Sequence, residues 1–288
     1  MIDYEEDYVW KTLLRYEGSV ALSAALYGFV SSVLCGVIHI FHGEVQLFLK
    51  ETGLEEITSS QIWAALTAVL TALLAFRTTQ ALARFWEGTS LLHQMRGEWF
   101  DSVSCLVSFS MGSKKTTEVK IFRQTLVRLM SLCHGSALEE IADTDSLTAI
   151  DVFGLDSATL RHLKTFKQDY GFNRVECLLH TMRQLATQAF HDKVVVIDAP
   201  ILTRVYQTLA RGFVNLLNAK KIVDTNFPFP YAQLIATLLW VNLILTPLIM
   251  ASLMRGSWVF ACLFTFVPIF GSFSLNAAAG QLENPFGN

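Results

Sequence analysis

Four long apolar stretches constrain this chain more than any other feature of its sequence. They cover residues 20–41, 62–76, 234–254 and 257–279, and none of them contains Asp, Glu, Lys or Arg. A helix needs roughly 20 apolar residues to cross the ~30 Å hydrocarbon layer of a bilayer. Three stretches reach that length alone, and we expect the second to extend outward through Thr58. The sequence therefore predicts an integral, multi-pass membrane protein with four transmembrane helices.

The composition agrees with a membrane protein and excludes other classes. Charged residues make up 16% of the chain, against about 25% in typical soluble domains, and hydrophobic residues make up 52%. A chain of 288 residues has too much surface to hide that much apolar material with so few charges. The net charge of −3 provides no basic surface, so we expect a lipid bilayer, and no nucleic acid, as a partner.

The middle of the chain differs from the four apolar stretches. It holds most of the charges, and its apolar residues recur with helical spacing, as at Ile121, Leu126 and Leu129. Turn and cap signals such as Gly154-Leu-Asp-Ser interrupt these periodic segments. We therefore expect helices here as well, and the predicted fold class is all-α.

Basic residues beside the spans predict the orientation, because Lys and Arg concentrate on the cytosolic side of membrane proteins. Seven of them would share one side, whereas only Lys50 and Arg255 would share the other. We therefore expect both termini and the polar middle in the cytosol, or in the stroma of a chloroplast. The membrane itself stays open between the cell membrane and the thylakoid membrane.

The spans and their orientation predict the domain organisation. Only Arg255 and Gly256 separate the third and fourth stretches, so these two helices form an antiparallel hairpin. The predicted parts are an N-terminal segment (1–19), two transmembrane helices (20–85), a cytosolic helical domain (86–230), two further transmembrane helices (231–280) and the start of a C-terminal tail (281–288).

The sequence lacks the common motifs of catalysis and metal binding. It contains no glycine-rich nucleotide-binding loop, no HExxH motif and no GxSxG motif, so we expect no enzyme. His39 and His42 lie three residues apart at a span end, a spacing more typical of a cap or a water-facing pair than of a metal site. Charges inside the spans would indicate a proton-coupled carrier. Their absence favours a passive path or a structural role.

Five short segments, in order along the chain, resemble the bestrophin family of ion channels. The most informative one ends the second span and reads Phe76-Arg-Thr-Thr-Gln-Ala-Leu-Ala-Arg84-Phe85-Trp86. The other four are residues 13–20 (LLRYEGSV), Asp198-Ala-Pro200-Ile201-Leu202, residues 224–233 (DTNFPFPYAQ) and Glu283-Asn284-Pro285-Phe286-Gly287. Each segment alone is weak, but five in the family's order, with four spans between them, are specific.

The resemblance implies a homopentamer around one central pore. The second span of each subunit would line a neck in the membrane, and the helical domain would enclose a vestibule with a narrow aperture. Chloride would be the permeant ion, together with other small anions such as nitrate and bicarbonate. Two alternatives stay open: a cation-conducting homologue of the same fold, or a non-conducting structural subunit of a larger membrane complex.

Helical periodicity in the second span offers two candidate pore-facing stripes. The candidates are Thr67, Thr71 and Ala75 on one stripe, and Ala68, Ala72 and Phe76 on the next. Spacing alone does not choose between them, because small residues also suit close helix packing in membranes. Counting back from Arg84-Phe85-Trp86, the resemblance assigns Ala68, Ala72 and Phe76 to the neck. The family usually has bulky apolar residues at all three places, so we expect a neck narrowed only at Phe76.

The resemblance also assigns an aperture residue and residues at the neck exit. Ile201 would form the cytosolic aperture, with Pro200 in the first turn of a helix; the alternative is a core isoleucine. Arg77 either attracts anions to the neck exit or anchors the helix by snorkelling. Arg84 and Trp86 are expected to anchor.

Family members bind calcium through acidic residues directly after Asn-Pro-Phe-Gly, and here the sequence departs from the pattern. Asn288 follows Gly287 directly, so Glu283, Asn284 and Asn288 supply too few of the six to eight oxygens that calcium requires. A calcium site would need further oxygens, for instance from the acidic residues 3–7. We interpret those residues as a solvated tail and assign no metal ligands. Calcium stays a candidate cofactor with an incomplete clasp, and two alternatives stay open: the clasp is absent, or its acidic residues follow Asn288.

Overall fold

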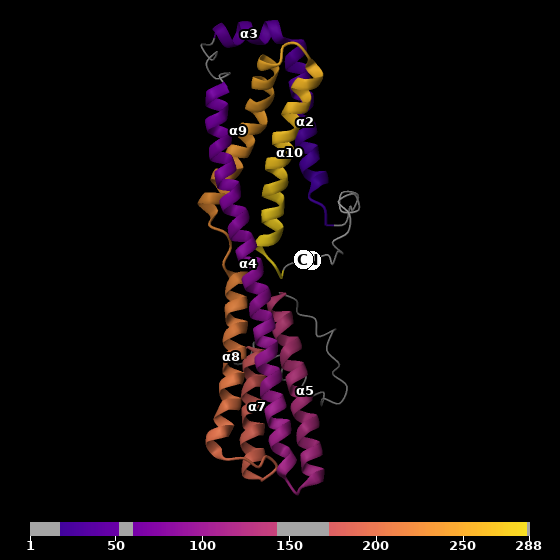
Figure 1. Ribbon diagram of the computed structural model, residues 1–288, viewed down its shortest axis with the longest axis vertical. Helices are drawn as coiled ribbons and strands as arrows, with labels where there is room; N and C mark the ends of the chain where they lie inside the picture. Colours follow the sequence, from indigo (N-terminus) through magenta and orange to yellow (C-terminus); the bar gives the residue numbers. More distant parts are fainter. Residues whose placement is uncertain (1–17, 52–59, 143–172, 287–288) are drawn as a thin grey trace. The chain divides into compact units, whose positions relative to one another are not determined.

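The computed structural model describes residues 18–51, 60–142 and 173–286, and these ranges contain helices but no strand. This confirms the predicted all-α class for the described residues. The long helices are α2 (Ala21–Ile40), α3 (His42–Glu51), α4 (Ser60–Phe109), α5 (Thr116–Ile141), α7 (Arg174–His191), α8 (Ala199–Asp224), α9 (Phe229–Leu253) and α10 (Trp258–Glu283) (Figure 1).

Four of these helices, α2, α4, α9 and α10, are long and apolar enough to cross a membrane, as predicted. The second span extends further than the expected end at residue 85, because α4 continues unbroken for 50 residues to Phe109. No proline follows Phe76 before Phe109, so nothing in the sequence interrupts the helical hydrogen bonds. At 1.5 Å per residue, α4 is about 75 Å long and extends well beyond a bilayer core. Thr58 lies outside the described residues.

Contacts divide the described residues into two compact units. The span unit contains the described residues up to Phe85 together with Asn226–Pro285. The bundle unit contains the described residues from Trp86 to Thr225 together with Phe286. The helix α4 contributes its first part to the span unit and its second part to the bundle unit. The assignment of the two units to membrane and cytosol stays a prediction.

Close helix packing organises the span unit, in which α2, α9 and α10 lie against one another (Figure 1). A Cβ atom on Gly28 of α2 would lie 3.0 Å from the Phe266 ring of α10, so the glycine allows an approach that a larger residue would push apart by a few tenths of an ångström. Nearby, the rings of Tyr27 and Phe273 stack with centroids 4.3 Å apart. The helix α4 joins through Leu70 and Leu74, which are buried against Ile235 and Leu239 of α9.

Pro247 lies inside α9 and removes one backbone hydrogen bond of that helix, which a side chain of α2 replaces. A proline has no N–H, so the carbonyl four residues earlier, that of Leu243, loses its helical donor. An unsatisfied carbonyl is costly inside a membrane. The buried Ser31 hydroxyl of α2 donates a hydrogen bond of 3.0 Å to this oxygen. A side chain from one span therefore completes the backbone of another.

We predict that Ser31→Ala lowers the stability of the protein by about 1–3 kcal/mol, because the Leu243 carbonyl then has no donor. Pro247→Ala supplies the matched control, since it restores a backbone N–H to the same oxygen. The cost of Ser31→Ala should therefore shrink to below about 0.5 kcal/mol in the Pro247→Ala background. Denaturant titrations of the four proteins in detergent micelles measure both values. Equal costs in the two backgrounds would contradict this assignment.

The bundle unit packs the second part of α4 with α5, α7 and α8 around one apolar core (Figure 1). Trp99 lies in this core, and its indole Nε1 donates to the carbonyl of Leu209 at 3.3 Å. Its ring meets His134 edge-on, and burial, together with Arg96, lowers the pKa of that imidazole. A Cβ atom on Gly212 of α8 would overlap the indole of Trp99. The crossing of α4 and α8 therefore depends on a glycine.

We predict that Gly212→Ala destabilises the bundle unit by about 1–3 kcal/mol, because the Trp99 ring has to move away from Leu209. Gly97→Ala in α4 is the control, since its added Cβ meets nothing within 4 Å. That variant should keep or slightly raise stability, as alanine favours a helix more than glycine. Thermal unfolding followed by tryptophan fluorescence distinguishes the two. A Gly212→Ala protein as stable as the parent would contradict the crossing described above.

Candidate functional site

Ala68, Ala72 and Phe76 lie on the side of α4 opposite Leu70 and Leu74, which pack against α9. Leu70 and Leu74 mark the packed face and are almost completely buried. Each residue turns a helix by about 100°, so a position two residues from a leucine lies on the opposite side. The three candidate neck residues have that spacing and are exposed, with 44% of the Phe76 surface accessible.

The alternative stripe lies beside the packed face instead. Thr67 is half-buried, and its hydroxyl donates to the backbone carbonyls of Trp63 and Ala64 at 2.8 and 3.0 Å. Thr71 and Ala75 are exposed. Of the two candidate stripes, therefore, only the one formed by Ala68, Ala72 and Phe76 is exposed at all three positions. The assignment of that stripe to a pore stays a prediction.

Phe76 is supported by aromatic residues from the start of α9. Its ring lies against Tyr231, with ring centroids 5.8 Å apart and the planes tilted by 39°. Tyr231 in turn lies 6.2 Å from Phe227. The side of Phe76 that does not face outward is thus held by residues of the segment that enters α9.

Arg77 has an internal partner that the sequence did not reveal. Its guanidinium donates from Nε to Oε1 of Glu283 at 2.6 Å and from Nη2 to Oε2 at 3.0 Å. Its Nη1 donates to Asn276 Oδ1, and its Cζ lies 5.4 Å from the centre of the Phe227 ring. Only 13% of the Arg77 side chain is exposed. Neither anion attraction nor snorkelling, the two roles considered above, includes such a carboxylate partner.

Arg84 and Trp86 lie where α4 passes from the span unit to the bundle unit. The side chain of Arg84 is half-buried, and that of Trp86 is exposed. Their expected role as anchors stays a prediction.

Ile201 lies at the start of α8 and is exposed over 47% of its surface. Pro200 occupies the first turn of α8, as expected, because its missing N–H is harmless there. The neighbouring Leu202 is the residue that enters the core. The alternative of a core isoleucine at position 201 is therefore wrong.

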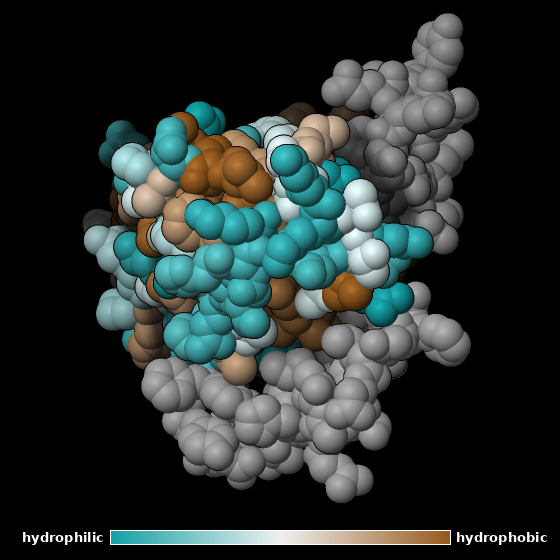
Figure 2. Space-filling view, turned by 90° about the horizontal axis from the view of Figure 1, so that it is seen from below, coloured by the Kyte–Doolittle hydropathy of each residue, from teal (hydrophilic) through white to brown (hydrophobic). Residues whose placement is uncertain are grey.

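The loop before α8 is tied to the end of α4. The N–H of Val196 donates to the carbonyl of Phe109 at 3.1 Å, and Ser113 Oγ donates to the carbonyl of Lys193 at 2.8 Å. These bonds fix the segment that leads to Ile201. This end of the bundle unit presents mainly hydrophilic side chains, with smaller hydrophobic areas between them (Figure 2).

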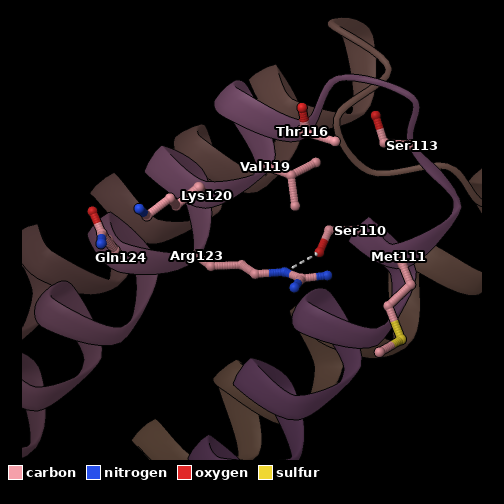
Figure 3. A pocket seen from close by; sticks show the side chains of 8 residues that line it. All are labelled: Ser110, Met111, Ser113, Thr116, Val119, Lys120, Arg123 and Gln124. Carbon is pink, nitrogen blue, oxygen red and sulfur yellow. Dashed lines mark hydrogen bonds between the residues drawn. The ribbon is translucent and has the colours of Figure 1, made fainter.

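A cavity of about 370 Å³ lies between the end of α4 and the start of α5 (Figure 3). Arg123 extends into it and donates from Nε to Ser110 Oγ at 2.8 Å and from Nη2 to the carbonyl of Val107 at 3.3 Å. These bonds satisfy groups at the C-terminal end of α4, which lack helical donors. The arginine therefore has a structural task, and we assign no ligand to the cavity.

Metal ligands do not cluster in the part of the chain that the structure describes. No group of three or more His, Cys, Asp or Glu side chains there could hold a metal ion. The rings of His39 and His42 lie 6.4 Å apart, a pair with no third ligand among the described residues. Both carboxylate oxygens of Glu283, one of the considered calcium ligands, bind Arg77. Residues 3–7 and Asn288 lie outside the described ranges.

Comparison with known proteins agrees with this architecture. A crystal structure of a bacterial bestrophin homologue from Klebsiella pneumoniae, determined by Zn-SAD phasing, superposes with a TM-score of 0.71 at 15% identity, over 93% of this chain and 90% of that one. A variant of the Klebsiella pneumoniae homologue superposes with a TM-score of 0.74 at 14% identity, over 94% of this chain and 91% of that one. At these identities the structures show a shared fold. No curated protein sequence matches significantly.

The family comparison is decisive because it covers the whole chain. The sequence profile described as bacterial/fungal bestrophin protein matches residues 1–288. The resemblance seen in five short segments is thereby confirmed, and the chain belongs to the bacterial and fungal bestrophin family.

Proposed function

We propose that this protein is a passive, anion-selective channel that conducts chloride and other small anions such as nitrate and bicarbonate as a homopentamer. Bestrophins are known as channels and not as enzymes, so no catalytic activity is proposed. Membership of the family and the four apolar helices support a channel in a membrane. The pore would form between subunits, because closed cyclic rings are the ordinary arrangement of identical membrane subunits.

The exposed stripe of Ala68, Ala72 and Phe76 is the observation that carries this proposal. It is uncharged, it lies opposite the packed face of α4, and it runs along one of the four candidate spans. Five copies of this face around one axis would form a neck lined by methyl groups and phenyl rings. A narrow apolar ring closes by losing water, whereas a wider one stays hydrated.

Phe76 would then be the narrowest point of the neck. The positive edges of five phenyl rings suit an anion better than a cation. We predict that Phe76→Ala raises single-channel conductance at least twofold and reduces the preference for chloride over potassium. Recordings of purified protein in planar bilayers, under a salt gradient, measure both quantities. Unchanged conductance and reversal potential would show that Phe76 does not line the path.

Ala72→Phe tests the same face one turn away. We predict a loss of chloride current of about tenfold or more, because a second ring of bulky apolar side chains narrows the neck. Ala75→Phe is the matched control, since it adds the same ring to the alternative stripe. If Ala72→Phe assembles and conducts like the parent while Ala75→Phe blocks, the alternative stripe lines the pore.

Ile201 would form the aperture at the other end of the path. We predict that Ile201→Ala changes the permeability ratio of nitrate to chloride and leaves assembly and thermal stability intact, because the exposed side chain supports no core. Leu202→Ala, a core truncation, should instead lower stability by about 2–5 kcal/mol. An unchanged permeability ratio in Ile201→Ala would refute the aperture assignment.

The two alternatives give different results in the same recordings. A cation-conducting homologue would show a reversal potential of the opposite sign in asymmetric potassium chloride. A non-conducting structural subunit would assemble as a pentamer, embedded in the bilayer, and pass no current. Mass photometry of the purified particle tests the subunit count independently of conduction. A calcium clasp is not part of the proposal, because Glu283 already binds Arg77.

A further inference from the structure

The chain passes between the span unit and the bundle unit at three places. They are the Phe85–Trp86 step within α4, the Thr225–Asn226 step before α9, and the Pro285–Phe286 step after α10. Phe286, the last of these residues, packs against the core of the bundle unit. At these three places the backbone itself links the two units.

Arg77 contacts residues next to two of the connections and lies on the helix that makes the third. It is eight residues before Phe85 on α4. Its guanidinium lies over Phe227, the second residue after the step before α9. It forms a two-bond ion pair with Glu283, two residues before Pro285 at the end of α10. One side chain thus joins the three segments. We call the group formed by Arg77, Phe227, Asn276 and Glu283 the Arg77 clamp.

The clamp has the features of a strong interaction. Two parallel N–H···O bonds to one carboxylate are charge-assisted and fix the guanidinium in one orientation. Arg77 and Glu283 are exposed over only 13% and 18% of their side chains, so water and salt screen the pair weakly. A surface pair such as Lys115 and Glu118, exposed over 46% and 53%, has none of these advantages.

The clamp lies directly beside the narrow point of the proposed neck. Phe76 precedes Arg77 on α4, and its ring rests on Tyr231, whose own ring meets Phe227 in the clamp. The contact with Tyr231 pins the phenyl ring of Phe76 against its own subunit. Five phenyl rings released from such contacts would associate with one another, because burial removes their apolar surface from water.

We propose that Arg77 and Glu283 are positioning residues that hold the Phe76 ring back and thereby keep the neck conducting. The inference rests on the proposed function for its effect on ion flow. All residues of the clamp belong to the span unit, and Arg77 follows Phe76 directly on α4. Breaking the ion pair removes the link between α4 and the end of α10. The aromatic contacts beside it then loosen, and the five Phe76 rings close the path.

The test uses the purified full chain in planar bilayers. We expect Glu283→Gln and Arg77→Gln each to lower the open fraction of the channel at least threefold. The exchanged pair, Arg77→Glu with Glu283→Arg, should restore it to within twofold of the parent. In the Phe76→Ala background, Glu283→Gln should have no effect, since no ring remains to close the neck. Glu118→Gln, in the exposed surface pair, is the control and should leave the open fraction unchanged.

Glu283→Gln also distinguishes the clamp from the role expected from the sequence, in which Arg77 attracts anions to the neck exit. An unpaired Arg77 would attract chloride and raise the current at low salt, where screening is weak. The clamp predicts a lower current at every salt concentration. A current that rises at low salt, an effect that persists in Phe76→Ala, or a failure of the exchanged pair to restore opening in a stable protein would each overturn the proposal.

Hydrogen exchange provides a readout that does not depend on conduction. Glu283→Gln should speed amide exchange at least threefold in the first turn of α9 and the last turn of α10, while Glu118→Gln should not. If the parent carries no current, the proposed function and the gating role are both refuted, and exchange decides whether the clamp exists. Unchanged exchange in Glu283→Gln overturns the clamp itself.

Discussion

The backbone polar groups of a helix that crosses a membrane have to find their partners inside the protein, because the interior of a bilayer offers none. This requirement explains why the spans are helices without Asp, Glu, Lys or Arg in their apolar stretches. It also explains the exception at Pro247, where Ser31 replaces the missing backbone donor from another helix. The described charged residues of the span unit all lie outside those stretches, and two of them, Arg77 and Glu283, neutralise each other.

The helix α4 links the proposed function to the fold. Its leucine face secures it to α9 through Leu70 and Leu74, and the opposite face carries Ala68, Ala72 and Phe76 with nothing from its own subunit over the two alanines to bury them. A face of that kind on a membrane helix meets lipid, another subunit or a pore. The bestrophin family favours the last two, and the proposed pentamer would use both.

The pairing of Arg77 changes what its charge can do. An isolated cation at the end of an apolar helix draws anions toward it, and salt weakens that attraction. A cation bound to a carboxylate by two hydrogen bonds contributes little net field, and instead ties two helices together. The two roles of Arg77 therefore predict opposite results for Glu283→Gln. If Arg77 acts through its electric field, losing the carboxylate raises the chloride current at low salt, whereas if it acts through its hydrogen bonds, the same change lowers the current.

The sequence alone determined the elements that depend on local properties. The length of the apolar stretches predicted the spans, and helical spacing predicted the all-α class, because both signals lie within a few turns of chain. Short motifs were enough to identify the family. Even here the extent of α4 was missed, since the absence of a proline after Phe76 says only that a helix is permitted to continue.

Only the tertiary structure decided which face of α4 is packed and which partner Arg77 takes. The two stripes beginning at Thr67 and Ala68 have the same period, and the structure shows that the second lies opposite Leu70 and Leu74, which pack against α9. Glu283 lies 206 residues from Arg77, and the sequence assigned it only as an insufficient calcium ligand. Its pairing follows from the packing of α10 beside α4, which brings a carboxylate within reach of both bonds of the guanidinium, a contact that local spacing cannot foresee.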